Sequence, residues 1–234
     1  MKISVILPTY NEAKNIVGLV NGIKREITSP WTTEIIVVDD NSNDGTYAAV
    51  ESSFRDDPDV SAILRTADRG LANSIRTGIE HASGDYLLVM DTDFTHRPEE
   101  LPLMLHVVGK VDLVSGSRFA AGGLMHNTPH YLASFVYNLL IRVIIRTQIQ
   151  DNLGGFWVAR ADRIRALPFD AIFFGYGDYY FRLLHYAQAS GMKIVELPAH
   201  YAERTGGKSK SNFLKLLLTY SGQLASHALK GRRS

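Results

Sequence analysis

Four short apolar runs, separated by stretches of helical periodicity, constrain the fold of this chain more than any other feature. The runs contain mostly Val, Ile and Leu, and they cover residues 3–9, 34–40, 61–65 and 85–91. Apolar runs of this length are typical of strands buried on both faces. The stretches between them carry apolar residues at helical spacing and cover residues 11–27, 43–54 and 69–82. Strand and helix alternating in this way predict an α/β fold with a parallel sheet and right-handed crossovers.

The second half of the chain is less regular. Strands are expected within 111–119, 154–160 and 193–201, and helices at 130–147 and within 175–191. The last segment, residues 211–234, has the pattern of an amphipathic helix with a basic end. For a chain of 234 residues we therefore expect one domain over residues 1–210, followed by this C-terminal helix.

Composition argues against several classes of protein. The formal net charge of +1 disfavours a nucleic-acid-binding protein that relies on bulk charge. The absence of cysteine removes disulfides, thiolate metal sites and a cysteine nucleophile. No G-x-G-x-x-G follows the first expected strand, which disfavours a Rossmann dehydrogenase. No uncharged apolar run reaches about 18 residues, so no transmembrane helix is expected.

Acidic residues follow the expected strands, at the ends where ligands bind in open α/β sheets. The second strand ends in Asp39 and Asp40, and the fourth is followed by Asp91 and Asp93. On an extended backbone residues i and i+2 point to the same side, so Asp91 and Asp93 are predicted to form a site for Mg²⁺ or Mn²⁺, completed by diphosphate oxygens. A D-x-D pair alone is equally compatible with a solvated loop. The second acidic strand end favours a metal–nucleotide site.

Several motifs in the chain belong to a known pattern. Within residues 2–123 they read SVILPTYNE, IIVVDDNSNDGT, GLANSIRTGIEHASGDYLLVMDTD and VSGSRFAAGG, and the pattern resumes at 151–162 and 201–210. Together these motifs resemble the inverting family 2 glycosyltransferases of the A-type fold. Within that family the chain is most similar to the dolichyl-phosphate and bacterial polyprenyl-phosphate mannose synthases. The resemblance implies a Rossmann-like, mixed but mainly parallel sheet flanked by helices.

The resemblance also implies roles for individual positions. The positions that match those holding the nucleotide base and ribose are Pro8, Tyr10, Glu12, Val38 and Asp40. Asp91 and Asp93 match the motif that contacts ribose and diphosphate and binds the metal, and Thr92 between them is expected to line the donor pocket. The cations that match phosphate-holding positions for donor and lipid acceptor are Arg118, Arg204 and Lys210. A metal ion and cations neutralise the diphosphate that leaves as the glycosidic bond breaks.

The chain departs from the family pattern in two places. Two positions after the second acid the family often has Gln or Ser, whereas this chain has Thr95, a shorter third candidate for the metal beside Asp91 and Asp93. Where the related archaeal and eukaryotic synthases have an Arg for the lipid phosphate, this chain has Leu132, with His130 nearby. Two interpretations of His130 remain open: it replaces that contact, or it lies at the surface or at a helix end.

The acidic residue Asp178 distinguishes two classes of acceptor. Many family members have an acidic residue at this point that acts as base for a hydroxyl acceptor. A phosphate monoester is already ionised at neutral pH and needs little help from a base. Asp178 therefore joins the candidate catalytic residues Asp91, Asp93 and Arg118 if the acceptor is an alcohol. It is structural or helix-capping if the acceptor is a lipid phosphate.

The segment 130–147 raises the question of membrane contact. It has a broad apolar face, and Arg142 and Arg146 lie on the other side. It is either an ordinary core helix or an interfacial helix whose apolar face enters a bilayer while arginines meet lipid phosphates. The resemblance favours the interfacial helix. It implies a peripheral protein on the cytoplasmic face of the membrane, with a homo-oligomer or a membrane-anchored partner as further possibilities.

The expected activity is transfer of a hexose, with inversion and with Mg²⁺ or Mn²⁺, from a nucleotide sugar to polyprenyl or dolichyl phosphate. GDP-mannose is the first candidate donor and UDP-glucose the second. Two alternatives remain open at this point. One is a glycosyltransferase that builds polysaccharide or modifies a soluble alcohol with Asp178 as base. The other is an inactive, nucleotide-binding scaffold subunit of a membrane complex.

Overall fold

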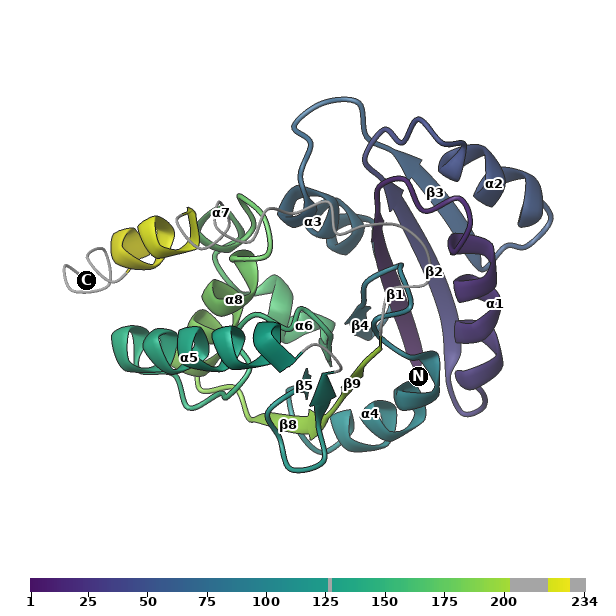
Figure 1. The fold of residues 1–234 in the computed structure, drawn as a ribbon. Helices are drawn as coiled ribbons and strands as arrows, with labels where there is room; N and C mark the ends of the chain where they lie inside the picture. The colour runs from purple at the N-terminus through teal and green to yellow at the C-terminus, as the bar shows by residue number, and fades with distance from the viewer. Residues whose placement is uncertain (126–127, 203–218, 228–234) are drawn as a thin grey trace.

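The main element of the fold is a seven-stranded sheet with the strand order β3-β2-β1-β4-β7-β5-β8 (Figure 1). The structure, a computed structural model, describes residues 1–125, 128–202 and 219–227. The strands of the main sheet are β1 (Lys2–Thr9), β2 (Thr32–Asp39), β3 (Val60–Leu64), β4 (Tyr86–Val89), β5 (Leu113–Ser117), β7 (Trp157–Arg160) and β8 (Ile194–Pro198). A small parallel pair is formed by β6 (Leu124–Met125) and β9 (His200–Tyr201).

All strand pairs of the main sheet are parallel except those of β7, which runs antiparallel to both β4 and β5. The carboxyl ends of β1, β2 and β4 therefore meet at one edge of the sheet. This arrangement confirms the predicted α/β class with a mixed, mainly parallel sheet.

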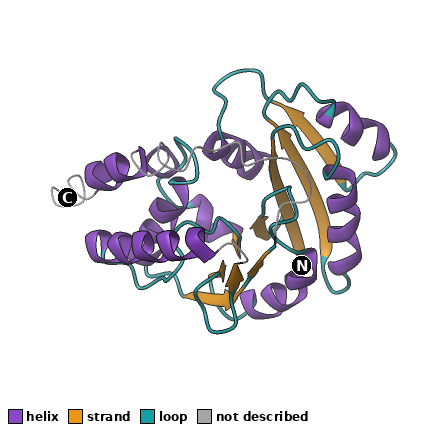
Figure 2. Ribbon diagram, in the orientation of Figure 1, coloured by secondary structure: helices purple, strands orange, loops and turns teal. Residues whose placement is uncertain are grey.

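Helices cover both faces of the sheet (Figure 2). Those that pack on one face are α1 (Ile16–Glu26), α2 (Thr46–Ser53) and α4 (Leu101–Val108), which follows the short 3-10 helix η1 (Pro98–Glu100). Those on the other face are α3 (Leu71–His81), α6 (Ala161–Arg165), α7 (Phe169–Ile172) and α8 (Tyr179–Ala189). The helix α5 (Thr128–Ile145) lies further out, beside α8 and the helical residues 219–227 (Figure 1).

Alternation along β1 explains how the two helical layers are held. Val5 and Leu7 pack with α1 and α4, whereas Ile6 packs with α3 on the opposite face. A Cβ on Gly78 would lie 2.4 Å from Cγ2 of Ile6, so the glycine allows α3 to approach β1 closely. Because helices pack on both faces of the sheet, the positions of the strand ends that precede the acidic residues are fixed.

The predicted membrane-facing segment and C-terminal helix are partly described. Residues 130–147 correspond largely to α5, and within the described residues no helix is both long and apolar enough to cross a bilayer. Residues 219–227 are helical, and the rest of 211–234 lies outside the described residues. Tyr220 and Leu224 pack against Tyr137 and Ile141 of α5 and Phe181 of α8, so this part of the C-terminal segment belongs to the folded body.

Candidate active site

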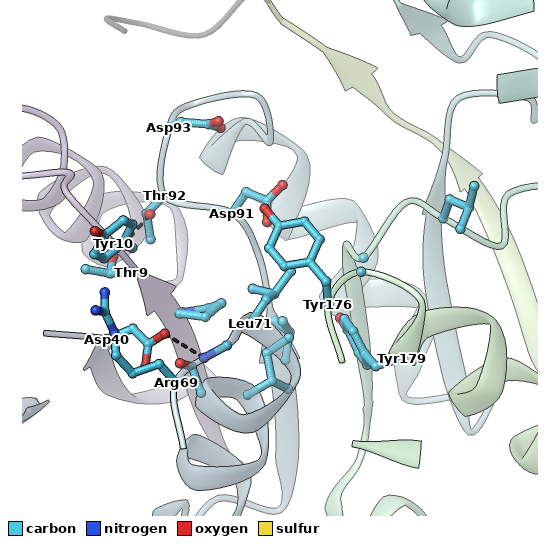
Figure 3. Close-up of a pocket in the computed structure, with 18 of the residues that line it drawn as sticks. Thr9, Tyr10, Asp40, Arg69, Leu71, Asp91, Thr92, Asp93, Tyr176 and Tyr179 are labelled. Atoms are coloured by element: carbon cyan, nitrogen blue, oxygen red, sulfur yellow. Dashed lines mark hydrogen bonds between the residues drawn. The ribbon is translucent and has the colours of Figure 1, made fainter. Parts of the chain in front are cut away.

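A cleft of about 800 Å³ opens at the carboxyl ends of β1, β2 and β4 (Figure 3). Its floor is formed by the strand ends and by the start of α3. Its far wall is formed by the loops at residues 153–155 and 176–177 and by residues 219–220. The side chains and backbone that line it include Pro8, Thr9, Tyr10, Glu12, Asp40, Arg69, Gly70, Leu71, Asp91, Thr92, Asp93, Gly154, Gly155, Tyr176, Gly177, Tyr179, Thr219 and Tyr220. The structure thus brings together most of the residues that the sequence assigned to the donor.

Asp40 is held in place by the loop that leads into α3. Its carboxylate accepts a hydrogen bond from the backbone N–H of Gly70 at 2.7 Å and one from Nη1 of Arg65 at 2.7 Å. The same Arg65 nitrogen donates to Oγ of Ser74 at 3.0 Å. Asp40 is buried and this ion pair is largely shielded from solvent, so the carboxylate is preorganised at the base of the cleft.

The entrance beside Asp40 is formed by an aromatic ring and a cation. The guanidinium carbon of Arg69 lies 4.8 Å from the centre of the Tyr10 ring, within the range of a cation–π contact. Figure 3 shows both side chains on the same side of the cleft as Asp40 and Thr92. Glu12 also lines the cleft, and its carboxylate accepts from the side-chain amide of Asn15 at 2.8 Å. These groups form a flat, polar-edged wall suited to a nucleoside.

Asp91 and Asp93 follow β4 in a turn rather than in an extended strand. Asp91 and Asp93 nevertheless extend to one side, while Thr92 lies on the other, toward Tyr10 and Thr9 (Figure 3). The hydroxyl of Thr9 donates to that of Thr92 at 3.1 Å. The residue after Asp93, Phe94, has φ of 61°, so the chain bends sharply here. A turn thus produces the shared orientation that the sequence attributed to a strand.

The two carboxylates suit a hard divalent cation. The Asp91 side chain is 43% exposed, toward the cleft, whereas Asp93 is buried. Among the described residues no group of three or more His, Cys, Asp or Glu surrounds one point as a ready-made metal site. Asp91 and Asp93 therefore fit an ion that takes its remaining ligands from diphosphate and water, as Mg²⁺ commonly does.

Thr95 is turned toward Asp93. Its hydroxyl donates to Oδ1 of Asp93 at 2.5 Å, and its backbone N–H donates to the same oxygen at 3.1 Å. Thr95 does not line the cleft. In this structure its hydroxyl and backbone N–H hold the Asp93 carboxylate, and the direct contact between Thr95 and a metal stays a prediction.

Arg118 has a structural partner that the sequence did not indicate. Its Nε and Nη2 donate to the Asp151 carboxylate at 2.7 and 2.6 Å, and its guanidinium stacks at 4.9 Å over the Tyr201 ring. Burial lowers the pKa of Arg118, but the adjacent Asp151 carboxylate more than offsets this, so the net direction is upward. Arg118 does not line the cleft, and its Nε and Nη2 both donate to Asp151. Its predicted contact with a phosphate stays a prediction.

Asp178 is buried in an ion pair within the protein. Its side chain is 1% exposed and forms an ion pair with Arg182 on the next turn of α8. The carboxylate also accepts from the backbone N–H of Tyr176 at 2.8 Å, and it makes no capping hydrogen bond to α8. These contacts are those of a structural residue held by an ion pair rather than of a helix cap, and the catalytic role of Asp178 stays a prediction.

The remaining predicted residues divide into two groups. Val38 is fully buried in the core between the sheet and α3, so its side chain packs there and does not line the cleft. Arg204 and Lys210, together with the side chain of His130, lie outside the described residues. Leu132 is 63% exposed on α5.

Several cleft residues were not predicted. Arg69, Tyr176, Tyr179, Thr219 and Tyr220 line the cleft although no acidic or phosphate-binding motif marks them. Burial raises the pKa of Tyr179 well above its ordinary value, although its oxygen accepts a hydrogen bond from the Trp157 indole at 3.3 Å. The sequence GYG at 175–177 is the one local feature that could have indicated this wall of the cleft. A Cβ on Gly177 would lie 2.5 Å from the Tyr220 oxygen, so only a glycine leaves room for Tyr220 there.

Fold and site together define the class of protein. A mixed sheet whose acidic strand ends border a nucleotide-sized cleft is the arrangement of the A-type glycosyltransferases. The structure is similar to that of glucosyl-3-phosphoglycerate synthase from Mycobacterium tuberculosis in complex with phosphoglyceric acid, with a TM-score of 0.73 and 18% sequence identity over 98% of this chain and 79% of that chain. At this identity the similarity concerns the fold alone.

The sequence comparison identifies the family. The profile of glycosyl transferase family 2 matches residues 4–167, and the chain belongs to this family of glycosyltransferases. It is 35% identical to an undecaprenyl-phosphate mannosyltransferase of Micrococcus luteus, over 90% of this chain and 87% of the relative. It is 33% identical to a dolichol-phosphate mannosyltransferase of Pyrococcus furiosus, over 90% of this chain and 59% of the relative.

Proposed function

We propose that this glycosyltransferase moves a hexose from a nucleoside diphosphate sugar to a polyprenyl phosphate, with inversion and with Mg²⁺ or Mn²⁺. The names of the two relatives favour mannose, so GDP-mannose is the first candidate donor and UDP-glucose the second. A structural neighbour was crystallised with Mn²⁺ and uridine diphosphate, which supports a divalent cation in this fold.

The observation that carries the choice of acceptor is the burial of Asp178. An alcohol acceptor needs a base to remove its proton, and the residue expected for that role is held by Arg182 inside the protein. A phosphate oxygen is already ionised and has no such requirement. The geometry therefore favours a phosphate acceptor over polysaccharide or a soluble alcohol. The intact Asp91 and Asp93 at an open cleft likewise disfavour an inactive scaffold.

The chemistry of the proposed reaction needs little from the protein beyond binding and charge. An oxygen of the acceptor phosphate attacks C1 of the hexose from the face opposite the diphosphate. The bond from C1 to the diphosphate oxygen breaks, and the nucleoside diphosphate leaves with its electron pair. Asp40 and Tyr10 line the part of the cleft that suits the nucleoside, while Asp91 and Asp93 face the diphosphate. The cation, when bound, stabilises the negative charge of the leaving group.

The outer face of α5 supports a lipid-linked acceptor. One side of this helix packs in the protein through Tyr137, Ile141 and Ile145. The opposite side exposes large apolar side chains at Leu132, Phe135, Val136, Leu139, Leu140, Val143 and Ile144. An exposed apolar patch on an amphipathic helix is typical of interfacial binding. We infer that this α5 face contacts the cytoplasmic surface of the membrane that holds the acceptor.

The test is a panel of donors and acceptors. Purified protein is supplied with GDP-mannose or UDP-glucose, with and without Mn²⁺, and with undecaprenyl phosphate or the corresponding alcohol. We expect cation-dependent transfer to the lipid phosphate, detected by mass spectrometry of the lipid. Transfer to the alcohol at a similar rate would contradict the phosphate acceptor. Absence of both transfer and donor hydrolysis would contradict the activity itself.

A further inference from the structure

His96 lies directly behind Asp91 and is not explained by any role described so far. The residue is 1% exposed and lies in the bend that follows Asp91 and Asp93. Its Nδ1 accepts a hydrogen bond from the backbone N–H of Asp91 at 2.9 Å. The ring is stacked on Phe156, with centres 4.7 Å apart and an interplanar angle of 12°, and it contacts the Tyr201 ring edge-on at 4.8 Å.

These contacts fix the position of the ring proton. A backbone N–H only donates, so the nitrogen that accepts from Asp91 carries no proton. In a neutral imidazole the proton is then on Nε2. A flip of the ring about its Cβ–Cγ bond would keep the stacking on Phe156 but would put a carbon in place of Nδ1, so the hydrogen bond from Asp91 holds the ring in this orientation.

The second nitrogen points at the carboxylate of the same aspartate. Nε2 of His96 lies 3.9 Å from Oδ2 of Asp91, and among the described residues it has no hydrogen-bond partner. Buried polar atoms in native proteins are nearly always paired, so an unpaired Nε2–H facing a carboxylate indicates a contact made in another state. A movement of about 1 Å would bring the two atoms to hydrogen-bond distance.

We propose that His96 is a positioning residue for Asp91. Its Nδ1 holds the backbone of Asp91, and its Nε2–H donates to Oδ2 when the nucleoside diphosphate and its cation occupy the cleft. The other carboxylate oxygen, Oδ1, is then directed at the ligand. This inference rests on the proposed nucleotide-sugar function of the cleft. It assigns to His96 the same kind of support that Thr95 gives to Asp93.

Two substitutions distinguish the roles of the two ring nitrogens of His96. In His96→Asn the amide oxygen takes the place of Nδ1 and still accepts from Asp91, but no donor remains at the Nε2 position. In His96→Gln the amide nitrogen reaches the Nε2 position and the Nδ1 acceptor is lost. His81→Asn, at an exposed histidine of α3, is the matched control.

The measurements are Mn²⁺ affinity by electron paramagnetic resonance in the presence of GDP or UDP, thermal stability, and kcat with donor KM. Loss of a group that supports a metal ligand typically costs about 10- to 100-fold in metal affinity or activity. Both variants lose the buried, stacked ring and are expected to melt at a lower temperature than wild type. At a temperature where both are folded, we expect the loss of Mn²⁺ affinity for His96→Asn and recovery to within a few-fold for His96→Gln. Wild-type Mn²⁺ affinity in His96→Asn would overturn the proposal. So would equal losses in both variants accompanied by equal losses of stability.

A spectroscopic measurement keeps the proposal testable if either variant fails to fold. In wild-type protein with ¹⁵N-labelled histidine, two-bond correlations identify the protonated ring nitrogen. We expect His96 to show the Nε2–H form and its Nε2 resonance to move when GDP or UDP is added with Mg²⁺. The Nδ1–H form, or no movement on saturation, would overturn it. None of these binding measurements needs glycosyl transfer, so a negative acceptor panel leaves them interpretable.

Discussion

Replacing Asp178 by asparagine tests whether this residue is a catalytic base or half of a buried ion pair. Both side chains of the pair with Arg182 are 1% exposed. Arg182 also donates from Nε to the carbonyl oxygen of Ile172 at 3.0 Å, which keeps the guanidinium in place. Burial lowers the pKa of Arg182 despite the opposing effect of Asp178. Asparagine keeps an oxygen near Tyr176 but leaves this buried cation without its negative partner.

The two roles of Asp178 predict opposite results. Removing one partner of a buried ion pair costs about 3–5 kcal/mol of unfolding free energy. For a chain of this size that loss lowers the melting temperature by roughly 10 °C. Removing a general base instead lowers the rate by about 10²- to 10⁴-fold. From the structure we expect the loss of stability, with kcat of the folded variant within about tenfold of wild type.

The assay combines urea unfolding with initial rates measured at a temperature where the variant is fully folded. The control is the double variant Asp178→Leu with Arg182→Met. Replacing both members of a buried pair by apolar residues removes the unpaired charge, so part of the lost stability should return. The return is partial because the backbone groups of Tyr176 and Ile172 lose their side-chain partners. The reasoning would be refuted by an unchanged melting temperature together with a kcat reduced 100-fold or more.

Three further predictions follow from the geometry. Asp93→Asn should reduce Mn²⁺-dependent donor turnover by about 100-fold, and turnover equal to wild type would remove its role at the cation. Burial raises the pKa of Glu34, but hydrogen bonds, led by that from Ser4, lower it from 4.5 to about 2. The stability contributed is complete above pH 4.5 and is lost as pH falls toward 2. Glu34→Gln should therefore flatten the melting temperature over this range, measured by circular dichroism; a slope equal to wild type would contradict this. Val143→Glu on α5 should lower sedimentation with anionic liposomes by about tenfold, whereas Leu103→Glu on α4 should not. Equal binding by both variants would contradict contact through α5.

The elements of the first half could be predicted because their signals are local. The apolar runs that became β1, β2 and β4 are buried on both faces, as their lack of alternation indicated. Asp40, Asp91 and Asp93 follow those strands, and in a parallel sheet the carboxyl ends meet at one edge whatever the loops do. The position of the cleft follows from strand order alone.

The pairing of charged residues could not be predicted, because partners far apart in sequence decide it. Nothing local marks Asp151 as the partner of Arg118, or Arg65 as the partner of Asp40. Val38 directly precedes Asp39 and Asp40 at the strand end, but it lies on the face covered by α3 and packs in the core.

The same limit applies to the far wall of the cleft. Tyr220 is separated from the strand ends by more than a hundred residues, and it reaches the cleft only because 219–227 pack on α5 and α8. No pattern within the C-terminal segment indicates that contact. A helical period predicts an apolar face, but the element that covers this face is decided by the tertiary fold.

The antiparallel strand β7 has a consequence for how the protein can be divided and made. β4, which carries Asp91 and Asp93 at its end, pairs with β1 on one side and β7 on the other. During synthesis the N-terminal half of the sheet therefore has an open edge until Trp157–Arg160 have emerged. An N-terminal fragment ending before β7 would expose the backbone of β4, and exposed strand edges promote aggregation. The two halves of the sequence are thus one folding unit, joined at the strand that precedes Asp91 and Asp93.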